Sequence, residues 1–429
     1  MKYYLWTVGC QMNKADSEKL AAGFTRMGHR ATDRPERADI VVLNTCSVRQ
    51  HAEERAYSKL GRMRELKRER PDLKVALMGC MVGLKTTDLE RRFPFVDVFA
   101  RPQQFAPIVE LVDGPAEDLG GEFWPTTYAI PEGPAAYVPV VHGCNKFCTY
   151  CIVPYRRGRE KSRPAAEIVR EVAYLAANGV REVTLLGQTV EAYGHDLPEQ
   201  PDLGDLMHEL AAVQRLDRIR FLTSYPRDMT HRILEAVAAI PKVMECFSLP
   251  VQAGSDRVLE SMRRGYSKQE YVDKIAEVRA LMPSAGITTD VIVGYPGETE
   301  ADFEETCALL EDLRFDKVHV AAYSPRPGTI AFRTMPDDIT AAEKSRRLHR
   351  VEEIEGRISL ELNSAYVGTT QQILVEGVRG DQPFGRTRTG KLVHLDDQPA
   401  RTGALVDVRI DHAGPFSLRG APVDALAVV

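Results

Sequence analysis

The sequence has no long apolar segment, because no run of about 18 or more apolar residues, the length that suggests a membrane-spanning helix, occurs in it. Its first residues, MKYYLWTVGCQMNK, turn polar before the apolar core of a signal peptide is complete. The eight cysteines do not pair by spacing into a disulfide framework. We therefore expect a cytoplasmic protein with reduced thiols and no contact with membranes.

The chain also lacks a strong net charge, since 56 Lys and Arg against 61 Asp and Glu leave −5 at pH 7. This balance argues against a protein that coats nucleic acid generally. Positive charge is concentrated in segments 62–70 and 156–163, which carry five basic residues each. The first segment fits a solvated helix face as well as a binding surface. The second begins five residues after a cysteine, which favours contact with substrate phosphate.

What the sequence does have is a tight group of cysteines, Cys144, Cys148 and Cys151, in the run GCNKFCTYC. Three thiolates at this spacing can hold three corners of a [4Fe–4S] cube and leave the fourth iron open. The alternatives are a zinc site and a buried apolar trio. Zinc sites usually complete four ligands with a second Cys or His pair, and no such pair follows here. The spacing CxxxCxxC resembles that of radical S-adenosylmethionine enzymes, which implies that the open iron binds S-adenosylmethionine.

A second group of cysteines is dispersed in the sequence but shares a local pattern. Cys10, Cys46 and Cys80 end the apolar runs YYLWTVGC, ADIVVLNTC and LKVALMGC. Such runs predict buried parallel strands, and the carboxyl ends of parallel strands meet at one edge of a sheet. We predict that the three cysteines lie at that edge and hold a second iron–sulfur cluster with an open iron. Three unrelated buried thiols are the alternative.

The remaining two cysteines have the pattern of core residues. Cys307 shares one face of a predicted helix with Phe303 and Leu310. Cys246 begins the apolar run CFSLPV, which predicts a strand. We expect both to be small buried residues and not ligands.

With 429 residues, the chain is expected to form two or three domains of the α/β class. Residues 1–112 alternate strand and helix patterns, as a parallel-sheet domain does. Residues 113–135 are rich in Gly and Pro and predict a linker. Residues 136–365 contain six further strand patterns, too few for an eight-stranded barrel, so we predict a partial (β/α)6 barrel. A long polar helix beginning at 340 is expected to leave that barrel.

Residues 366–429 change to short Val, Leu and Ile runs between Gly, Pro and Asp turns, which predicts a small antiparallel β barrel. Its tract GRTRTGKLVHL carries Arg386, Arg388 and Lys391. On a strand, Arg386 and Arg388 would share one face. We predict that the three cations bind RNA; a charged, exposed edge strand is the alternative.

The motifs resemble the methylthiotransferases, radical S-adenosylmethionine enzymes that insert a methylthio group into tRNA or a ribosomal protein. The resemblance extends over essentially the whole chain. Its N-terminal part is carried by GCQMNKADSEK, NTCSVRQHAEER and MGCM, and its radical domain by GCNKFCTYCIVPYRRGREKSRP, LPVQAGSDRVLESMRRGY and AYSPRPGT. The C-terminal part resembles a TRAM domain, an RNA-binding β barrel, through GRTRTGKLVHL and FSLRG.

Within this family, GCQMN and GRTRTGKLV are most similar to the branch that acts on isopentenyladenosine beside the tRNA anticodon. The sequence departs from that branch at Thr189, where Asn is usual, and at Tyr225, where His is usual. The alternatives are methylthiolation of threonylcarbamoyladenosine in tRNA or of a ribosomal protein aspartate. A non-catalytic iron–sulfur protein that binds RNA is an alternative from another class.

The resemblance implies two [4Fe–4S] clusters and S-adenosylmethionine as cofactors, with no catalytic side chain beyond the cluster ligands. Gln188, Ser224 and Gln252 end predicted barrel strands and are candidate S-adenosylmethionine contacts. Arg264 is a candidate partner for its carboxylate, since Arg pairs well with carboxylates. Structural hydrogen bonds are the alternative for each. The implied partners are a tRNA anticodon stem-loop, an external electron donor and a sulfur donor, and we expect a monomer.

Overall fold

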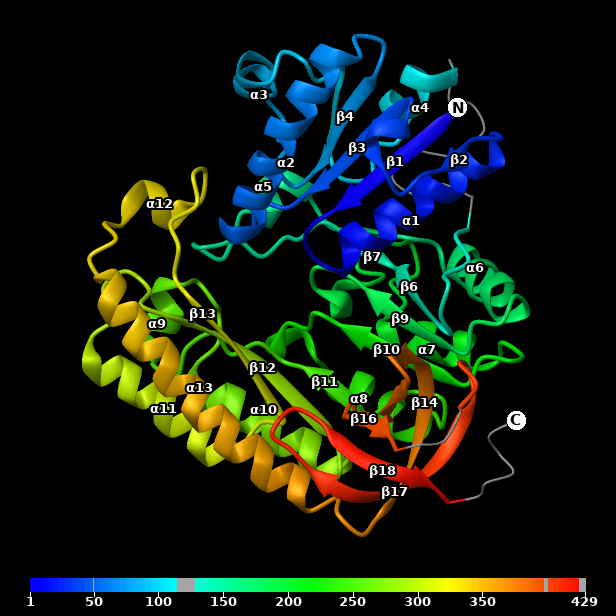
Figure 1. Cartoon of the computed structure of the whole chain (residues 1–429). Coiled ribbons are helices and arrows are strands. Elements are labelled where there is room, and N and C mark those ends of the chain that lie inside the picture. Colours follow the sequence, from blue (N-terminus) through cyan, green and yellow to red (C-terminus); the bar gives the residue numbers. More distant parts are fainter. Residues whose placement is uncertain (49, 114–127, 397–399, 424–429) are drawn as a thin grey trace. The chain divides into compact units, whose positions relative to one another are not determined.

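The computed structural model describes residues 1–48, 50–113, 128–396 and 400–423 (Figure 1). The chain forms two compact units, which are described separately. The first unit comprises Met1–Ile130, Tyr137–Phe147 and Cys151–Arg163. The second comprises Pro131–Ala136, Cys148–Tyr150 and Pro164–Val429. Most of the predicted linker 113–135 lies outside the described residues, and the division into domains 1–112, 136–365 and 366–429 stays a prediction.

The first unit is built on a five-stranded parallel sheet in the order β2-β1-β3-β4-β5. Its strands are β1 (Lys2–Thr7), β2 (Arg30–Ala31), β3 (Ile40–Thr45), β4 (Lys74–Gly79) and β5 (Val98–Ala100). The parallel-sheet N-terminal domain is therefore confirmed.

Helices cover both faces of this sheet. Ile40 and Val42 of β3 pack with the core that includes α1 (Gln11–Arg26) and α4 (Ala106–Asp113). Their neighbours Val41 and Leu43 pack with the core that includes α2 (Gln50–Glu69). Successive strand residues point to opposite faces, so a continuous apolar run is what a sheet between two helical layers requires. The short helix α3 (Thr87–Arg92) follows β4.

The first unit also includes the segment from Tyr137 to Arg163, apart from Cys148–Tyr150. Here β7 (Val141–His142) and β8 (Lys161–Ser162) form a two-stranded antiparallel pair. Between them lies the short helix α5 (Val153–Arg157). Cys144, Cys151 and the basic segment 156–163 belong to this part of the first unit, whereas Cys148 belongs to the second unit.

The barrel strands form two three-stranded sheets, β10-β9-β6 and β11-β12-β13. Their bounds are β6 (Ala135–Pro139), β9 (Glu182–Leu186), β10 (Arg218–Leu222), β11 (Cys246–Ser248), β12 (Gly286–Val293) and β13 (Lys317–Ala322). The pairs β9–β10, β11–β12 and β12–β13 are parallel. Each of the six predicted strands is present, which confirms the partial barrel.

Helices follow the strands of the barrel and begin at recognisable caps. They are α6 (Ala165–Ala177), α7 (Leu203–Ala211), α8 (His231–Ala239), α9 (Asp256–Ser261), α10 (Lys268–Leu281), α11 (Glu300–Leu313) and α12 (Ile330–Thr334). Asp202, Ser267 and Thr299 each form a capping box, which satisfies free amide groups of the first turn. Among the described residues, no helix combines the length and the apolar character needed to cross a bilayer.

The long helix α13 (Ala341–Ser364) does not leave the barrel, so that expectation was wrong. It packs along β13 and α11. Val351, Ile354 and Ile358, spaced for one helix face, are at most 2 % exposed. Charged residues dominate the remaining sequence of α13 and concealed this apolar stripe.

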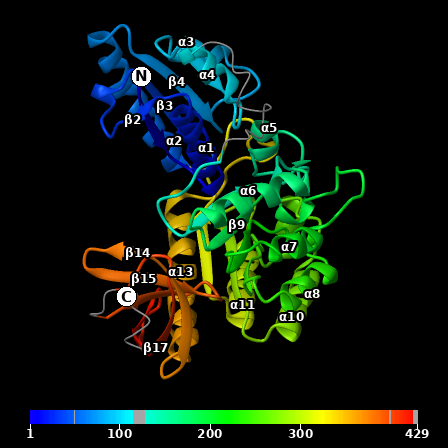
Figure 2. The ribbon, with the colours of Figure 1, turned by 90° about the vertical axis from the view of Figure 1, so that its right-hand side faces the viewer.

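The C-terminal residues form the predicted small barrel, closed in the order β14-β15-β16-β18-β17. The strands are β14 (Thr370–Arg379), β15 (Gln382–Thr387), β16 (Leu392–Leu395), β17 (Leu405–Ala413) and β18 (Leu418–Pro422). All pairs are antiparallel except β16 with β18. This barrel lies beside α13 (Figures 1 and 2).

Candidate metal centres

The three N-terminal cysteines follow three neighbouring strands of one sheet. Cys10 comes after β1, Cys46 directly after β3 and Cys80 directly after β4. The sheet order β1-β3-β4 makes these strands adjacent, and they run in the same direction. The predicted meeting of the cysteines at one sheet edge is confirmed, while metal binding there stays a prediction.

Glycine precedes two of these cysteines for a steric reason. Gly79 has φ +97°, and a Cβ atom there would lie 2.3 Å from the carbonyl oxygen of Thr45. Gly9 has φ +137°, and its Cβ would lie 2.9 Å from the Cβ of Cys46. Only glycine adopts such backbone angles at little cost while leaving this space free. The GC pairs thus allow the strand ends to approach one another.

Asn13, in the first turn of α1, joins the strand ends by hydrogen bonds. Its Nδ2 donates to the carbonyl oxygen of Thr45 at 2.8 Å and to Oδ1 of Asn44 at 3.0 Å. Its Oδ1 accepts from the Sγ of Cys10 at 3.5 Å and from Nη2 of Arg157 at 3.0 Å. Neither Asn13 nor Arg157 was predicted from the sequence as a site residue. The only signal for Asn13 was its position three residues after Cys10, within the GCQMN motif.

Burial dominates the electrostatics of this centre. It raises the pKa of the Cys80 thiol to about 12, against the opposing effect of Arg157. All eight cysteines are free thiols. Burial lowers the pKa of Arg157, but Cys80, Asp16 and Cys10 raise it by more, so this side chain stays a cation. An anionic group bound to the thiols would therefore meet a fixed positive charge.

The donors fit an iron–sulfur cluster better than a single ion. Within the described part of the chain, no group of three or more His, Cys, Asp or Glu side chains converges closely enough to hold one metal ion. A cubane cluster gives each thiolate its own iron, so its ligands need not meet at one point. Three reduced thiols beside a buried cation suit such an anionic group.

The second cysteine group has polar donors at two of its sulfur atoms. In the first unit, the backbone nitrogen of Lys146 donates to the Sγ of Cys144 at 3.3 Å. In the second unit, Nη1 of Arg264 donates to the Sγ of Cys148 at 3.5 Å. Hydrogen bonds to cysteine sulfur are one of the features that tune iron–sulfur clusters, so the residues present fit that group.

Arg264 is buried and fixed from several sides, with 5 % of its surface exposed. Its Nη2 donates to the carbonyl oxygen of Pro250 at 2.9 Å, and its Nε donates to the hydroxyl of Tyr266 at 2.9 Å. The guanidinium carbon lies 4.7 Å from the ring centroid of Tyr225. Tyr225, which stands where the isopentenyladenosine branch usually has His, therefore packs on Arg264, the predicted partner of the S-adenosylmethionine carboxylate.

Strained backbone marks the carboxyl ends of β10 and β11. Thr223 has φ +72° and Gln252 has φ +77°, and Arg263, next to Arg264, has φ +57°. Left-handed angles are rare for residues other than glycine, above all for a β-branched residue such as Thr, and they cluster at functional sites. The strained positions are, or adjoin, the predicted contacts Gln252, Ser224 and Arg264.

Ser224 lies beside a buried carboxylate that was not predicted from the sequence. Glu191 is 1 % exposed, and its Oε2 accepts from the backbone nitrogen of Tyr225 at 3.0 Å. Burial raises the pKa of Glu191 to about 7, although hydrogen bonds from Ser224 and from the Tyr225 backbone act in the opposite direction. Gln188, which like Glu191 follows β9, is half-buried. The four predicted S-adenosylmethionine contacts stay predictions.

The predicted RNA-binding cations make contacts within the protein. Arg388 pairs with Glu245 at 2.9 Å and donates to the carbonyl oxygens of Val243 and Pro241 at 2.6 and 2.8 Å. Lys391 pairs with Asp316 at 2.6 Å. Arg388 also lies beyond the end of β15, so it does not share a strand face with Arg386, as had been expected.

Residues 387–391, named the docking turn here, lie against the amino ends of the barrel strands. Arg218, which opens β10, donates to the carbonyl oxygen of Arg386 at 2.7 Å. A Cβ at Gly286, which opens β12, would lie 2.2 Å from the carbonyl oxygen of Thr389. The side chain of Arg386 itself pairs with Glu376 of β14 at 3.1 Å. RNA binding by Arg386, Arg388 and Lys391 stays a prediction, and the contacts that the structure contains are intramolecular.

The basic segment 156–163 is not a uniformly exposed surface. Arg157 and Arg163 are 2 % and 1 % exposed, and Arg163 donates to the carbonyl oxygen of Pro139 at 2.9 Å. Arg159 is exposed. The proposed contact with phosphate is thus restricted to the other cations of the segment.

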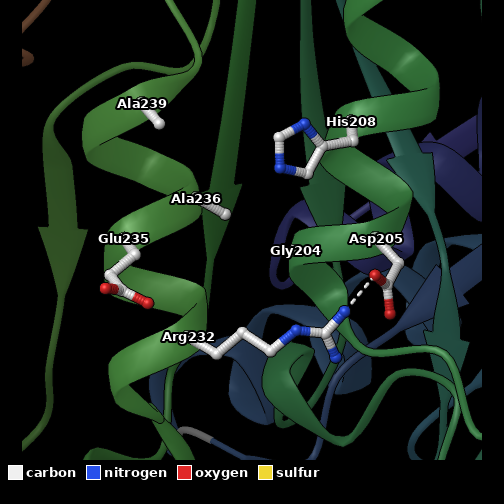
Figure 3. Close-up of a pocket in the computed structure, with 7 residues that line it drawn as sticks. All are labelled: Gly204, Asp205, His208, Arg232, Glu235, Ala236 and Ala239. Carbon is white, nitrogen blue, oxygen red and sulfur yellow. Dashed lines mark hydrogen bonds and ion pairs between the residues drawn. The ribbon is translucent and has the colours of Figure 1, made fainter.

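A surface pocket lies elsewhere, between α7 and α8 (Figure 3). Arg232 pairs there with Asp202 at 3.0 Å and also with Asp205, the two members of a capping box. Its lining contains none of the cysteines or the predicted cofactor contacts. We therefore assign the pocket to helix packing.

Comparison with family models divides the chain into three matched segments. Residues 2–100 match the uncharacterized protein family UPF0004, residues 138–310 match the Radical SAM superfamily, and residues 364–423 match the TRAM domain.

Curated relatives are similar over nearly the whole chain. A tRNA-2-methylthio-N(6)-dimethylallyladenosine synthase of Dehalococcoides mccartyi (strain CBDB1) is 44 % identical over 426 residues, which cover 99 % of each chain. A protein of the same name from Roseiflexus sp. (strain RS-1) is 46 % identical over 98 % of this chain and 89 % of its own. One from Chloroflexus aurantiacus is 45 % identical over 98 % of this chain and 91 % of its own.

Solved structures support the fold alone. The radical S-adenosylmethionine methyltransferase TsrM from Kitasatospora setae, with cobalamin and a [4Fe–4S] cluster bound, aligns with a TM-score of 0.56 at 13 % identity. The alignment covers 88 % of this chain and 81 % of that one. The cobalamin-dependent radical enzyme OxsB aligns with a TM-score of 0.52 at 10 % identity, over 82 % of this chain and 56 % of that one.

Proposed function

The chain belongs to the radical S-adenosylmethionine methylthiotransferase family, in the branch of the tRNA-2-methylthio-N(6)-dimethylallyladenosine synthases, and we propose that it methylthiolates carbon 2 of isopentenyladenosine in the tRNA anticodon loop. The curated relatives with that name are similar to this chain over nearly its full length. The observation that supports it within this chain is the presence of two separate cysteine triads, one of them assembled from three neighbouring strand ends.

In this proposal, each triad holds one [4Fe–4S] cluster. Cys144, Cys148 and Cys151 hold the first, and Cys10, Cys46 and Cys80 hold the second. Bound to these residues, the clusters supply one-electron reduction of S-adenosylmethionine and an open iron that can carry the transferred sulfur. Carbon 2 of adenine carries no acidic proton or leaving group, so side-chain acid–base chemistry alone cannot replace its hydrogen with sulfur.

The protein's own residues bind and orient the cofactor. Arg264, held by Pro250 and Tyr266, is the proposed partner of the S-adenosylmethionine carboxylate. Its hydrogen bonds fix the guanidinium before the ligand arrives, which lowers the ordering cost of binding. Gln188, Ser224 and Gln252 are the proposed contacts at neighbouring strand ends, where parallel α/β folds bind ligands.

The proposed RNA partner is the anticodon stem-loop of tRNA. A base that reacts must leave its stack, at a cost of a few kcal/mol that is lower in a single-stranded loop. The C-terminal barrel matches the TRAM domain, and we propose that it binds this RNA. We further propose a cytoplasmic monomer that depends on an external electron donor and a sulfur donor.

Anaerobic turnover with two substrates tests the proposal. The reconstituted enzyme receives S-adenosylmethionine, a reductant, and either tRNA that carries isopentenyladenosine or intact ribosomes, and mass spectrometry identifies the product. We expect a methylthio group on the tRNA adenosine only. Modification of threonylcarbamoyladenosine or of a ribosomal protein would show that the substrate is another one than proposed. Failure to cleave S-adenosylmethionine would indicate a non-catalytic RNA-binding protein.

A further inference from the structure

Arg157 is a fully buried cation whose charge no step of the proposed reaction uses. It ends α5 in the basic segment, yet only 2 % of its surface is exposed. Its Nη2 donates to Oδ1 of Asn13 at 3.0 Å and pairs with a carboxylate oxygen of Asp16 at 3.4 Å. The side chains of Arg157 and Asp16 are each 1 % exposed, so both charges have left water.

The other terminal nitrogen of Arg157 is unpartnered. Nη1 is buried and has no hydrogen-bond partner among the described residues. Oδ1 of Asn13 accepts from both Nη2 of Arg157 and the Sγ of Cys10, at 3.0 and 3.5 Å, which places the guanidinium beside the N-terminal cysteines. A buried donor without a partner costs free energy, so its persistence beside the thiols indicates a missing acceptor there.

Positive charge is concentrated around this centre. Asp16 is a buried carboxylate that pairs with Arg157, and Lys19, which is 5 % exposed, also acts on Asp16. Two buried cations therefore lie near one carboxylate beside the cysteines. Buried charge is stable only when it is paired.

We propose that Arg157 is the buried counter-cation of the N-terminal cysteine centre and a positioning residue that raises the reduction potential of the iron–sulfur cluster held there. The proposal rests on the second cluster of the proposed function. A cluster with three thiolates carries net negative charge, and net charge and hydrogen bonds to sulfur set its potential. A cation at short range favours the more negative, reduced form, and water screens it little inside the protein.

The test uses the full chain with Cys144, Cys148 and Cys151 changed to Ala, so that only the N-terminal cluster remains. Iron content and an anaerobic redox titration followed by electron paramagnetic resonance are measured in this parent and in its Arg157→Gln variant. We expect the potential of Arg157→Gln to fall by about 59 mV or more, a tenfold change in the one-electron equilibrium constant.

Two matched variants separate charge from shape. Arg157→Lys keeps the charge and is expected to retain most of the parent's potential. Arg159→Gln removes a charge from the exposed part of the same segment, and we expect the parent's potential. A full cluster with an unchanged potential in Arg157→Gln overturns the inference and leaves the proposed function standing.

A further variant serves if Arg157→Gln does not fold or does not retain iron. Asp16→Asn removes the carboxylate that pairs with Arg157, so the cation is less compensated and the potential is expected to rise. An unchanged or lower potential in Asp16→Asn would contradict the inference. Absence of iron from the parent itself would overturn both this inference and the second cluster.

Discussion

Gly79 illustrates how one missing side chain controls the N-terminal centre. We expect Gly79→Ala to lower the free energy of unfolding by roughly 3 kcal/mol or more, since the new Cβ would meet the Thr45 carbonyl oxygen at 2.3 Å while φ stays at +97°. Gly28→Ala is the control, because Gly28 has φ +83° with no atom within 4 Å of its Cβ position. Its cost should be about 1 kcal/mol. Equal losses, compared by thermal unfolding, would mean that the close approach is not rigid.

Glu191 predicts a dependence of stability on pH. Its pKa rises from 4.5 to about 7 in the folded protein because burial disfavours the charged form. The stability that comes from holding this group neutral is fully present below pH 4.5 and is lost as pH rises through 7. Glu191→Gln has no such loss, so its free energy of unfolding relative to the wild type should increase by about 2.5 kcal/mol between pH 5 and pH 8. A difference that does not change with pH in denaturation of the cluster-free protein would contradict the buried carboxyl.

The role of a residue could be predicted from the sequence when it depends on neighbouring residues, and could not when it depends on distant ones. The cysteines were predictable because each follows an apolar run directly, and a strand can place only its own last residues at a sheet edge. Asn13, Arg157 and Glu191 were not, since their roles depend on partners such as Thr45, 32 residues from Asn13, or Asn13 itself, 144 residues from Arg157. No local pattern encodes those distances.

The docking turn allows two explanations for any effect of Arg388 on RNA binding. A cation that contacts phosphate weakens binding and lowers the salt dependence when it is removed. A cation that only holds the turn acts through Glu245. We therefore expect Glu245→Ala and Arg388→Ala to weaken tRNA binding equally, with equal salt slopes, if docking alone matters.

If Arg388 instead binds RNA directly, as the sequence predicts, the variants Arg388→Ala and Glu245→Ala should differ. A loss of about one unit of salt slope in Arg388→Ala but not in Glu245→Ala would identify a phosphate contact. Binding isotherms at several salt concentrations distinguish the two. Because both side chains are about 30 % exposed (31 % and 28 %), their coupling in unfolding should not exceed about 1 kcal/mol.

Helices and strands could be predicted where the spacing of apolar residues fits one kind of element. The six barrel strands followed from apolar runs bounded by turn residues. The placement of α13 did not, because charged residues that pair with neighbours also occupy it. Arg347 lies on this helix with its side chain only 5 % exposed and pairs with Glu298 at 2.7 Å. A charged residue in sequence is therefore not always a solvated one.

The presence of two triads predicts that the functions of the whole enzyme can be separated. Cys46→Ala should still cleave S-adenosylmethionine to 5′-deoxyadenosine but form no methylthio product, because the sulfur site is lost while the radical site remains. Cys148→Ala should do neither. Iron should fall from about eight atoms to about four when either whole triad is replaced. Undiminished methylthio product from Cys46→Ala would refute the sulfur role of the N-terminal centre.

The docking turn also has a consequence for biosynthesis. The residues at the amino ends of β11 to β13 contact residues 387–391, which are translated 65 or more residues after β13 ends at Ala322. At ribosomal rates of about 5–20 residues per second, this interval lasts roughly 3–13 s. During this interval the radical domain is part of a nascent chain, and the docking turn does not yet cover the amino ends of its strands. A chaperone that binds the nascent chain would find its substrate in that interval.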